Sequence, residues 1–262
     1  MKKLTLFAFL TLIILVSSCK KNNENQTPVN PASAHLKSMV FTDTTGKYIS
    51  SMSFQYDSQG KVTQMIFDNP PDIDSLIYKY EYYSTMVIEK IFYRNNNKYG
   101  RNTYYLNSDG LATAEIDIGY NQNGDSSVAQ NVTYKYNIEG YMLEKKSYLY
   151  GDTATWGSYN WQIMNDNITS MKLSLSLWGG GSVTENYEYF PNSVNTLGNT
   201  NDGKMFLGKS STNLIKSSVT NNTTPKSGTY SYTFDATKRV IQEFIRGNGL
   251  TTSTVNLTCT YY

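Results

Sequence analysis

Histidine is nearly absent from this sequence: His35 is the single one in 262 residues. It stands near the start of the chain, ahead of the segment that we predict to fold. Histidine is the side chain most used for proton transfer near neutral pH, and it is a common zinc ligand. Its absence from the folded segment excludes Ser-His-Asp and Cys-His chemistry there. We therefore expect a protein that is not an enzyme and that holds no metal ion or other cofactor.

Cysteine is also scarce, and the net charge is small. The two cysteines are Cys19 and Cys259, and the formal charge is only +2, from 23 basic and 21 acidic residues. Basic and acidic residues are interspersed along the chain, whereas nucleic-acid-binding proteins gather basic residues in a patch or stripe. The sequence thus predicts no nucleic-acid partner.

The N-terminus has the pattern of a bacterial lipoprotein signal. Lys2 and Lys3 precede an apolar run from Leu4 to Val16, and two serines lead to Cys19. The run is about thirteen residues, shorter than the roughly twenty of a membrane-spanning helix. The VSSC tetrapeptide resembles the lipobox that lipoprotein signal peptidase recognises. We predict a signal peptide over 1–18 and a Cys19 that carries fatty acids such as palmitate, which would attach the protein to a membrane permanently.

The next segment predicts both location and domain organisation. Lys20 follows the cysteine, and by resemblance to Gram-negative sorting patterns this favours the outer membrane, on its periplasmic or its cell-surface side. Residues 19–35 are polar and read as a lipidated, flexible spacer. We expect a single all-β domain over 36–262. Cys259 alone would remain there, in an every-second-residue apolar series that is typical of a buried strand residue.

Alternation of apolar and polar residues dominates this domain, so each strand should have one face to bury. One segment places Ala112, Ala114, Ile116, Ile118 and Tyr120 on one face and Thr113, Glu115 and Asp117 on the other. Another places Met171, Leu173, Leu175 and Leu177 together. The period cannot tell whether such faces line a packed core, enclose a cavity or contact lipid. Because protein interiors are usually close-packed, we expect the inward-facing leucines of the 168–177 strand to fill a core and not to line a ligand chamber.

A repeated hairpin organises the strands. Its copies have two aromatic or apolar residues around one other residue, then Asp or Asn, then a turn, and start at Phe54, Tyr104, Tyr134 and Tyr232. A degenerate copy starts at Trp161. Asp57, Asn107, Asn137 and Asp235 should bond the backbone of each turn, and Gly60, Gly110 and Gly140 should supply positive φ. The repeated acidic or amide residue is therefore predicted to be structural.

These hairpins predict an antiparallel meander of about fifteen strands. A sheet of that width must roll up to hide its apolar face, so we expect a large curved sheet, as a flattened or half-open barrel. The long irregular stretch at about 191–229 is the natural candidate for a cap over one end.

The hairpins, the lipobox followed by lysines, and the segments from Tyr187, Leu207 and Tyr230 resemble Bacteroidetes lipoproteins of unknown function with a porin-like β fold. Similar aromatic-Asp-Gly hairpins occur in the YD repeats of large surface toxins. The last hairpin departs from the pattern, because Thr237 and Lys238 replace its glycine. The resemblance implies a fold and a location but no catalytic residues.

Two sets of residues are candidate sites. Trp156, Trp161 and Trp178, with Tyr150 and Tyr159, could form an aromatic platform for a glycan, although strands favour aromatic residues for packing in any case. Thr44, Ser75 and Thr153 follow aspartate in triplets that resemble the O-glycosylation motif of Bacteroidetes, at or near predicted turns.

Three functional classes are compatible with the sequence. The first is a lipoprotein without catalytic activity that binds a glycan, lipid or protein partner through its sheet or end loops. The second is a carrier of a lipid or other hydrophobic molecule in a half-open barrel, which a large apolar pocket would favour. The third is a transmembrane porin-like barrel.

Overall fold

The computed structural model describes residues 35–69, 73–95, 97–121, 123–149, 151, 155–176, 180–221, 225–247 and 254–262. The predicted signal peptide and Cys19 lie outside these ranges. Sixteen strands and one short 3-10 helix are present within them. They are β1 (Leu36–Thr42), β2 (Tyr48–Tyr56), β3 (Val62–Asn69), β4 (Ile73–Tyr82), β5 (Met86–Tyr93), β6 (Lys98–Leu106), β7 (Ala112–Tyr120), β8 (Ser126–Tyr136), β9 (Met142–Leu149), β10 (Thr155–Met164), β11 (Asn167–Leu175), β12 (Gly181–Val194), η1 (Met205–Leu207), β13 (Asn213–Asn221), β14 (Ser227–Phe234), β15 (Val240–Gly247) and β16 (Val255–Tyr261).

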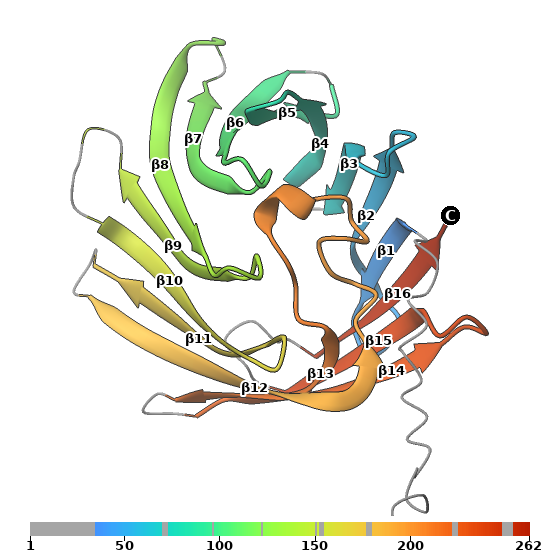
Figure 1. The fold of residues 1–262 in the computed structure, drawn as a ribbon. Helices are drawn as coiled ribbons and strands as arrows, with labels where there is room; N and C mark the ends of the chain where they lie inside the picture. Colours follow the sequence, from blue (N-terminus) through green and yellow to red (C-terminus); the bar gives the residue numbers. More distant parts are fainter. Residues whose placement is uncertain are drawn as a thin grey trace, which may run out of the picture. The chain divides into compact units, whose positions relative to one another are not determined.

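The strands form one closed antiparallel barrel in chain order (Figure 1). Each strand pairs with the next, and β1 pairs with β16, with Met39 opposite Cys259. The predicted meander is confirmed. The flattened or half-open barrel of about fifteen strands was wrong in detail, because the two terminal strands pair and leave no free edge, which is the usual way a barrel avoids edge-to-edge association.

The repeated turns have the predicted structure. Asp57 Oδ1 accepts hydrogen bonds from the backbone N–H groups of Gln59 (2.8 Å) and Lys61 (2.9 Å), and Gly60 has φ of 77°. The turns that begin at Asn107 and Asp235 use the same pair of bonds. In the last turn Lys238 takes the place of glycine at φ of 64°. Short polar side chains therefore fix where each strand ends.

One connection is long. Residues 195–212 join β12 to β13 and cross one end of the barrel, with η1 near the centre of Figure 1. We call this segment the plug. The predicted irregular stretch at 191–229 was too long, because β12 continues to Val194, β13 occupies Asn213–Asn221 and β14 begins at Ser227. The apolar alternation of β13 is weak, since serine and threonine fill most of its inward positions.

The plug is bonded to the turns around it. The backbone N–H of Leu36 donates to the Asn201 carbonyl (3.0 Å), and that of Lys209 donates to the Gly140 carbonyl (2.9 Å). The backbone N–H of Val240, the first residue of β15, donates to Thr196 Oγ1 (3.0 Å). Contacts with the starts of β1 and β15 and with the turn between β8 and β9 hold the plug at the end of the barrel.

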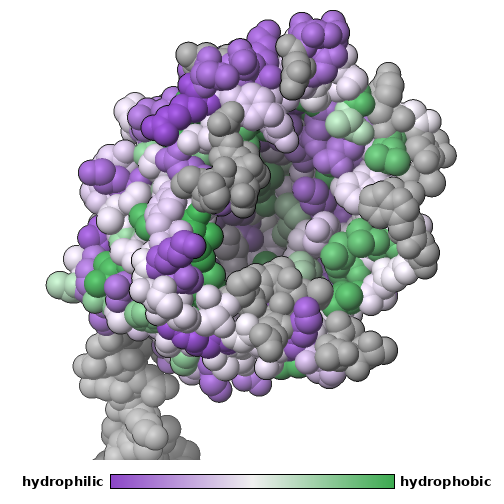
Figure 2. Space-filling view, turned by 180° about the vertical axis from the view of Figure 1, so that it is seen from behind, coloured by the Kyte–Doolittle hydropathy of each residue, from purple (hydrophilic) through white to green (hydrophobic). Residues whose placement is uncertain are grey.

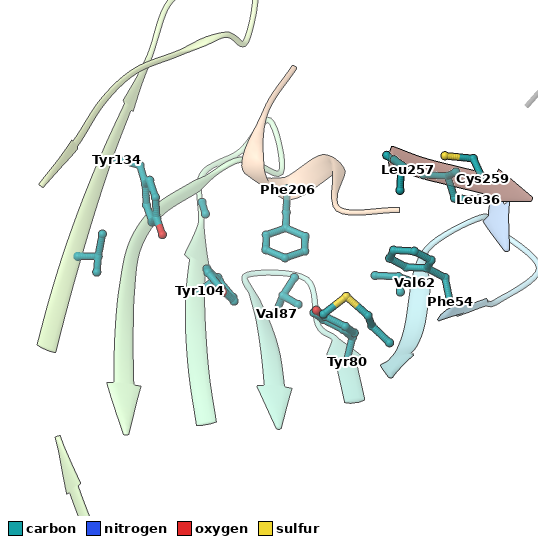
Figure 3. Packing of buried hydrophobic residues seen from close by; sticks show 13 residues of the cluster. Leu36, Phe54, Val62, Tyr80, Val87, Tyr104, Tyr134, Phe206, Leu257 and Cys259 are labelled. Atoms are coloured by element: carbon teal, nitrogen blue, oxygen red, sulfur yellow. The ribbon is translucent and has the colours of Figure 1, made fainter. Parts of the chain in front are cut away.

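A hydrophobic core lies beneath the plug (Figure 3). Phe206 of η1 is buried, and its ring centre is 4.9 Å from that of Tyr104 and 6.3 Å from that of Tyr82. The other buried members come from β1 to β8 and β16, among them Leu36, Phe54, Val62, Met65, Tyr80, Val87, Val132, Tyr134, Leu257 and Cys259. The first aromatic residue of three repeats, at Phe54, Tyr104 and Tyr134, belongs to this core. Each of these repeats thus contributes one aromatic residue to the core and one short polar residue to the turn that follows.

Strand β7 faces the opposite way from the prediction. Glu115 lies opposite inward-facing Tyr104, and Ile116 lies opposite Thr103 on the outer face. Glu115 is buried inside the barrel, and the Tyr134 hydroxyl donates a hydrogen bond to it. A bulge after Ala112 shifts the alternation by one residue, so the isoleucines of β7 lie outside. Hydrogen bonds stabilise the inward-facing Glu115 carboxylate.

Candidate functional site

The interior of the barrel is closely packed beneath the plug and more open toward the opposite end. Inward-facing residues of β1, β2, β8 and β16 are buried: Phe54 is 3%, Val132 is 1% and Leu257 is 3% exposed. At the last residues of β9 and β11, Leu149 is 41% and Leu175 is 43% exposed. The strand register shows that both leucines point inward. Leu149 lies opposite Gln130, whose side chain donates a hydrogen bond to Asp117 inside the barrel. Leu175 lies opposite Gly157, which belongs to the inward-facing series of β10. These two leucines therefore lie at the open mouth of the barrel, at the end away from the plug, and Leu175 is not in the packed core expected for it.

We call the side of the barrel that bears these leucines the open wall. It consists of inward-facing residues of β9, β10 and β11: Leu149, Tyr159, Trp161, Met171, Leu173 and Leu175. Viewed from behind, the molecule is hollowed at its centre, with hydrophobic and hydrophilic surface inside the hollow (Figure 2). The plug crosses the end that faces the viewer in Figure 1. The chamber is thus closed by the plug at one end and open at the other.

Aromatic residues of the open wall form a small platform. Tyr159 and Trp161 lie two residues apart on β10, and their rings stack with centres 5.7 Å apart and planes 14° apart. Leu173 lies opposite Tyr159 and Met171 lies opposite Trp161. Both pairs belong to one face of the sheet, so aromatic and aliphatic surface is continuous there. Such a surface can bind an apolar chain or the flat face of a ring.

The rest of the interior combines carboxylates with tyrosines. Asn102 Nδ2 (2.7 Å) and the Tyr104 hydroxyl (3.2 Å) donate to Glu89 Oε2. The Tyr187 hydroxyl donates to Glu185 Oε2 (3.1 Å) on the other side of the barrel. Since each of these carboxylates accepts hydrogen bonds, the polar interior is compatible with a stable fold. Sequence alternation alone did not identify these residues, because a strand face that carries carboxylates has the same pattern as a solvent-exposed face.

Burial raises the pKa of three groups in or near the core. Burial raises the pKa of Glu115 to about 7, against the lowering effect of the Tyr134 hydroxyl. In the plug, burial raises the pKa of Asp202 to about 6, and nearby Lys204 opposes the shift. Burial also raises the pKa of the Cys259 thiol to about 12, which makes this cysteine unreactive.

The structure describes Trp156, Trp161 and Tyr159 of the predicted aromatic platform. Trp161 faces the chamber, whereas Trp156 lies at a bulge of β10, five residues away and on the opposite alternation. Trp178 and Tyr150 lie outside the described residues. The partner of Trp161 is instead Tyr159, which the sequence also offered as a candidate.

The O-glycosylation candidates differ in their surroundings. Thr44 is exposed in the turn between β1 and β2, where Asp43 Oδ1 accepts from the backbone N–H of Thr45 (2.8 Å). Ser75 is inside β4 rather than in a turn, and its hydroxyl donates to Asp68 on β3. Thr153 lies outside the described residues. Of the two candidates that the structure describes, Thr44 has the accessible turn geometry that the prediction assumed.

Within the described ranges, no group of three or more histidine, cysteine, aspartate or glutamate side chains is arranged to hold a metal ion. No helix in that part of the chain is long and apolar enough to cross a membrane.

Comparisons with known proteins agree on the fold. The structure is similar to that of a porin-like protein from Bacteroides uniformis, with a TM-score of 0.62, 13% sequence identity, and coverage of 87% of this chain and 98% of that chain. A porin-like protein from Bacteroides vulgatus gives a TM-score of 0.58 and 10% identity, with coverage of 87% and 99%. No protein-family model matches the sequence. No curated protein matches it. The chain is thus a 16-stranded antiparallel barrel of porin-like fold.

Proposed function

We propose that this protein is a membrane-anchored binding protein whose barrel holds a small amphipathic molecule against the open wall. The observation that carries the proposal is the exposure of inward-facing apolar side chains, above all Leu149 and Leu175. An interior that only stabilises the fold is close-packed, as it is beneath the plug. Apolar residues in a concave, partly polar chamber are the usual lining of a small-molecule site.

The interior favours an amphipathic ligand over a purely apolar one. Tyr159, Trp161 and Leu173 supply an apolar surface, and Tyr187 on the neighbouring strand β12 supplies a hydroxyl group that can form a hydrogen bond. A lipid with a hydroxyl-rich or cationic headgroup, or a glycolipid, has both features. This proposal joins the glycan-binding and carrier alternatives of the sequence in a single site.

The outer face favours this function over that of a transmembrane barrel. A membrane barrel needs an outward apolar band about 25 Å tall. The outward-facing residues of β13 to β16 are mostly polar: Ser217, Val219, Thr229, Ser231, Thr233, Gln242, Phe244, Arg246, Asn256, Thr258 and Thr260. Burying these groups in lipid would leave their side chains without partners, at a cost of several kcal/mol in total.

Attachment to the outer membrane is the second part of the proposal. It is supported by the VSSC pattern at Cys19 and by Lys20 after it. Cys19→Ala should abolish fatty-acid incorporation in cells grown with labelled palmitate and leave the protein unprocessed or unattached. Unchanged incorporation in the variant would disprove attachment at this residue and leave the chamber proposal intact.

The chamber is tested by native mass spectrometry of the protein as the cell processes it, purified in a mild detergent. We expect a stoichiometric bound molecule that is lost or reduced in Trp161→Ala. Trp156→Ala is the matched control, because it removes the same residue type from the same strand outside the chamber.

Binding of the apolar fluorescent probe N-phenyl-1-naphthylamine gives a second readout. The probe should bind the parent and Trp156→Ala alike and bind Trp161→Ala several-fold more weakly, because aromatic side chains dominate such sites. A protein that carries no ligand and binds no probe would refute the chamber function.

A further inference from the structure

A second binding feature lies on the outer wall of the barrel, separate from the chamber. A depression of about 260 Å³ is lined by Lys90, Phe92, Lys98, Gly100, Arg101 and Tyr120, from β5, β6 and β7. Lys90 lies opposite Arg101, and Arg101 lies opposite Ile118 of the outward face of β7. The lining side chains therefore point away from the chamber. We call this depression the outer basic site.

Its cations stand side by side through the register of the sheet. Lys79 of β4 lies opposite Lys90 of β5, which in turn lies opposite Arg101 of β6. Like charges directly opposite each other on neighbouring strands destabilise a sheet by a few tenths of a kcal/mol or more. A row of three cations across three strands is thus retained at a cost to the fold.

Few carboxylates offset this charge. Glu81 pairs with Lys90. Lys79, Lys98 and Arg101 form no ion pair with any residue that the structure describes. Aromatic rings hold two of the ammonium groups instead: Lys79 Nζ lies 5.4 Å from the ring centre of Phe92, and Lys98 Nζ lies 5.5 Å from that of Tyr120.

Arg101 has an unused donor. Its Nε is buried and has no hydrogen-bond partner among the described residues. Buried donors nearly always have partners, and the guanidinium fork is shaped to bind two oxygens of one oxyanion. The missing partner is therefore best supplied by a ligand in the depression.

We propose that the outer basic site binds a phosphate group. A phosphate ester carries about 1.5 to 2 negative charges near pH 7 and presents three acceptor oxygens. This matches the guanidinium of Arg101 and the ammonium of Lys98, the two lining cations that pair with no carboxylate in the described part of the chain. The rings of Phe92 and Tyr120 offer contact to the part of the molecule that carries the phosphate. The phosphate can belong to a soluble ester or to a phospholipid headgroup.

The test is isothermal titration of the purified, processed protein in a non-ionic detergent at constant ionic strength. The probes are inorganic phosphate, short-chain dihexanoyl phosphatidate, and dihexanoyl phosphatidylcholine, in which choline caps the phosphate. We expect saturable binding of phosphate or phosphatidate that weakens about tenfold or more in Arg101→Gln, since a charge-assisted hydrogen bond to a phosphate is lost. Exposed Lys98→Gln should weaken it several-fold without affecting the fold.

Lys172→Gln is the matched control, because Lys172 is also an exposed lysine but projects from β11 on the other side of the barrel. Melting curves check that each variant is folded. Phosphatidate that binds about tenfold more tightly than phosphate would identify a lipid headgroup, and equal binding would identify a soluble phosphate. Binding that is unchanged in both Arg101→Gln and Lys98→Gln, or absent for all three probes, would overturn the proposal.

Discussion

At the scale of single residues, the turns show which positions the sequence can specify. Asp and Asn at the start of each hairpin bond the backbone ahead, and this interaction depends on neighbouring residues only. For this reason the turns could be predicted correctly. The inward position of Glu115 could not, because it depends on a bulge and on a hydroxyl from another strand.

The turn positions give the first prediction. Gly110 has φ of 78°, and a Cβ there would meet nothing within 4 Å, so Gly110→Val measures backbone strain alone. The change should lower the free energy of unfolding by about 1–2 kcal/mol. Lys238→Gly should raise it by up to about 1 kcal/mol, because Lys238 already occupies this conformation at φ of 64°. Chemical denaturation measures both changes, and shifts of the same sign in the two variants would contradict the turn assignment.

Glu115 gives a prediction on pH dependence. Its folded pKa of about 7 exceeds the ordinary value of 4.5 because of burial. Between these values the folded chain binds more protons than the unfolded chain, so stability falls as the pH rises from about 4.5 to about 7 and stays lower above it. Glu115→Gln keeps an acceptor for the Tyr134 hydroxyl and removes the titration.

Relative to the parent, Glu115→Gln should therefore gain about 1–3 kcal/mol between pH 4.5 and pH 8. Urea denaturation of both proteins across this range measures the gain. Asp202 and other buried carboxyls titrate in both proteins and cancel in the difference. Parallel stability curves for the two proteins would mean that Glu115 ionises normally.

At the scale of elements, the plug determines which part of the interior is packed. Phe206, on a helix of three residues, lies against the rings of Tyr82 and Tyr104, which belong to hairpin strands far away in the sequence. Sequence analysis found an irregular segment there and proposed a cap. It misplaced the ends, because serine- and threonine-rich β13 lacks the apolar alternation that reveals a strand.

The plug gives the third prediction. Phe206→Ala should cost about 3–5 kcal/mol of unfolding free energy, because it leaves a cavity among the rings of the core. Met205→Ala, at the neighbouring residue with 46% of its surface exposed, should cost less than about 1 kcal/mol. Thermal or urea denaturation compares the two variants. Equal losses would show that the plug does not pack into the barrel as described.

At the scale of the whole molecule, the closed barrel combines a packed core beneath the plug with an open mouth at its other end. Strand alternation predicted a meander but not its closure, since pairing of β1 with β16 joins the two ends of the chain. It also grouped Met171, Leu173 and Leu175 without showing what lies opposite them. The plug packs its apolar residues against the core of β1 to β8 and β16, and the ends of β9 and β11 away from it are exposed.

The most direct test of the account is solvent access to the open wall. A maleimide reagent is reacted with folded Leu175→Cys and Met164→Cys variants, and modification of each position is followed by peptide mass spectrometry. Met164 is 62% exposed, and native Cys259, which is 3% exposed, is the buried reference in both proteins. We predict that the new thiol at position 175 reacts within about tenfold of the rate at position 164 and far faster than Cys259. A thiol at position 175 that reacts as slowly as Cys259 would show a filled interior and contradict the chamber.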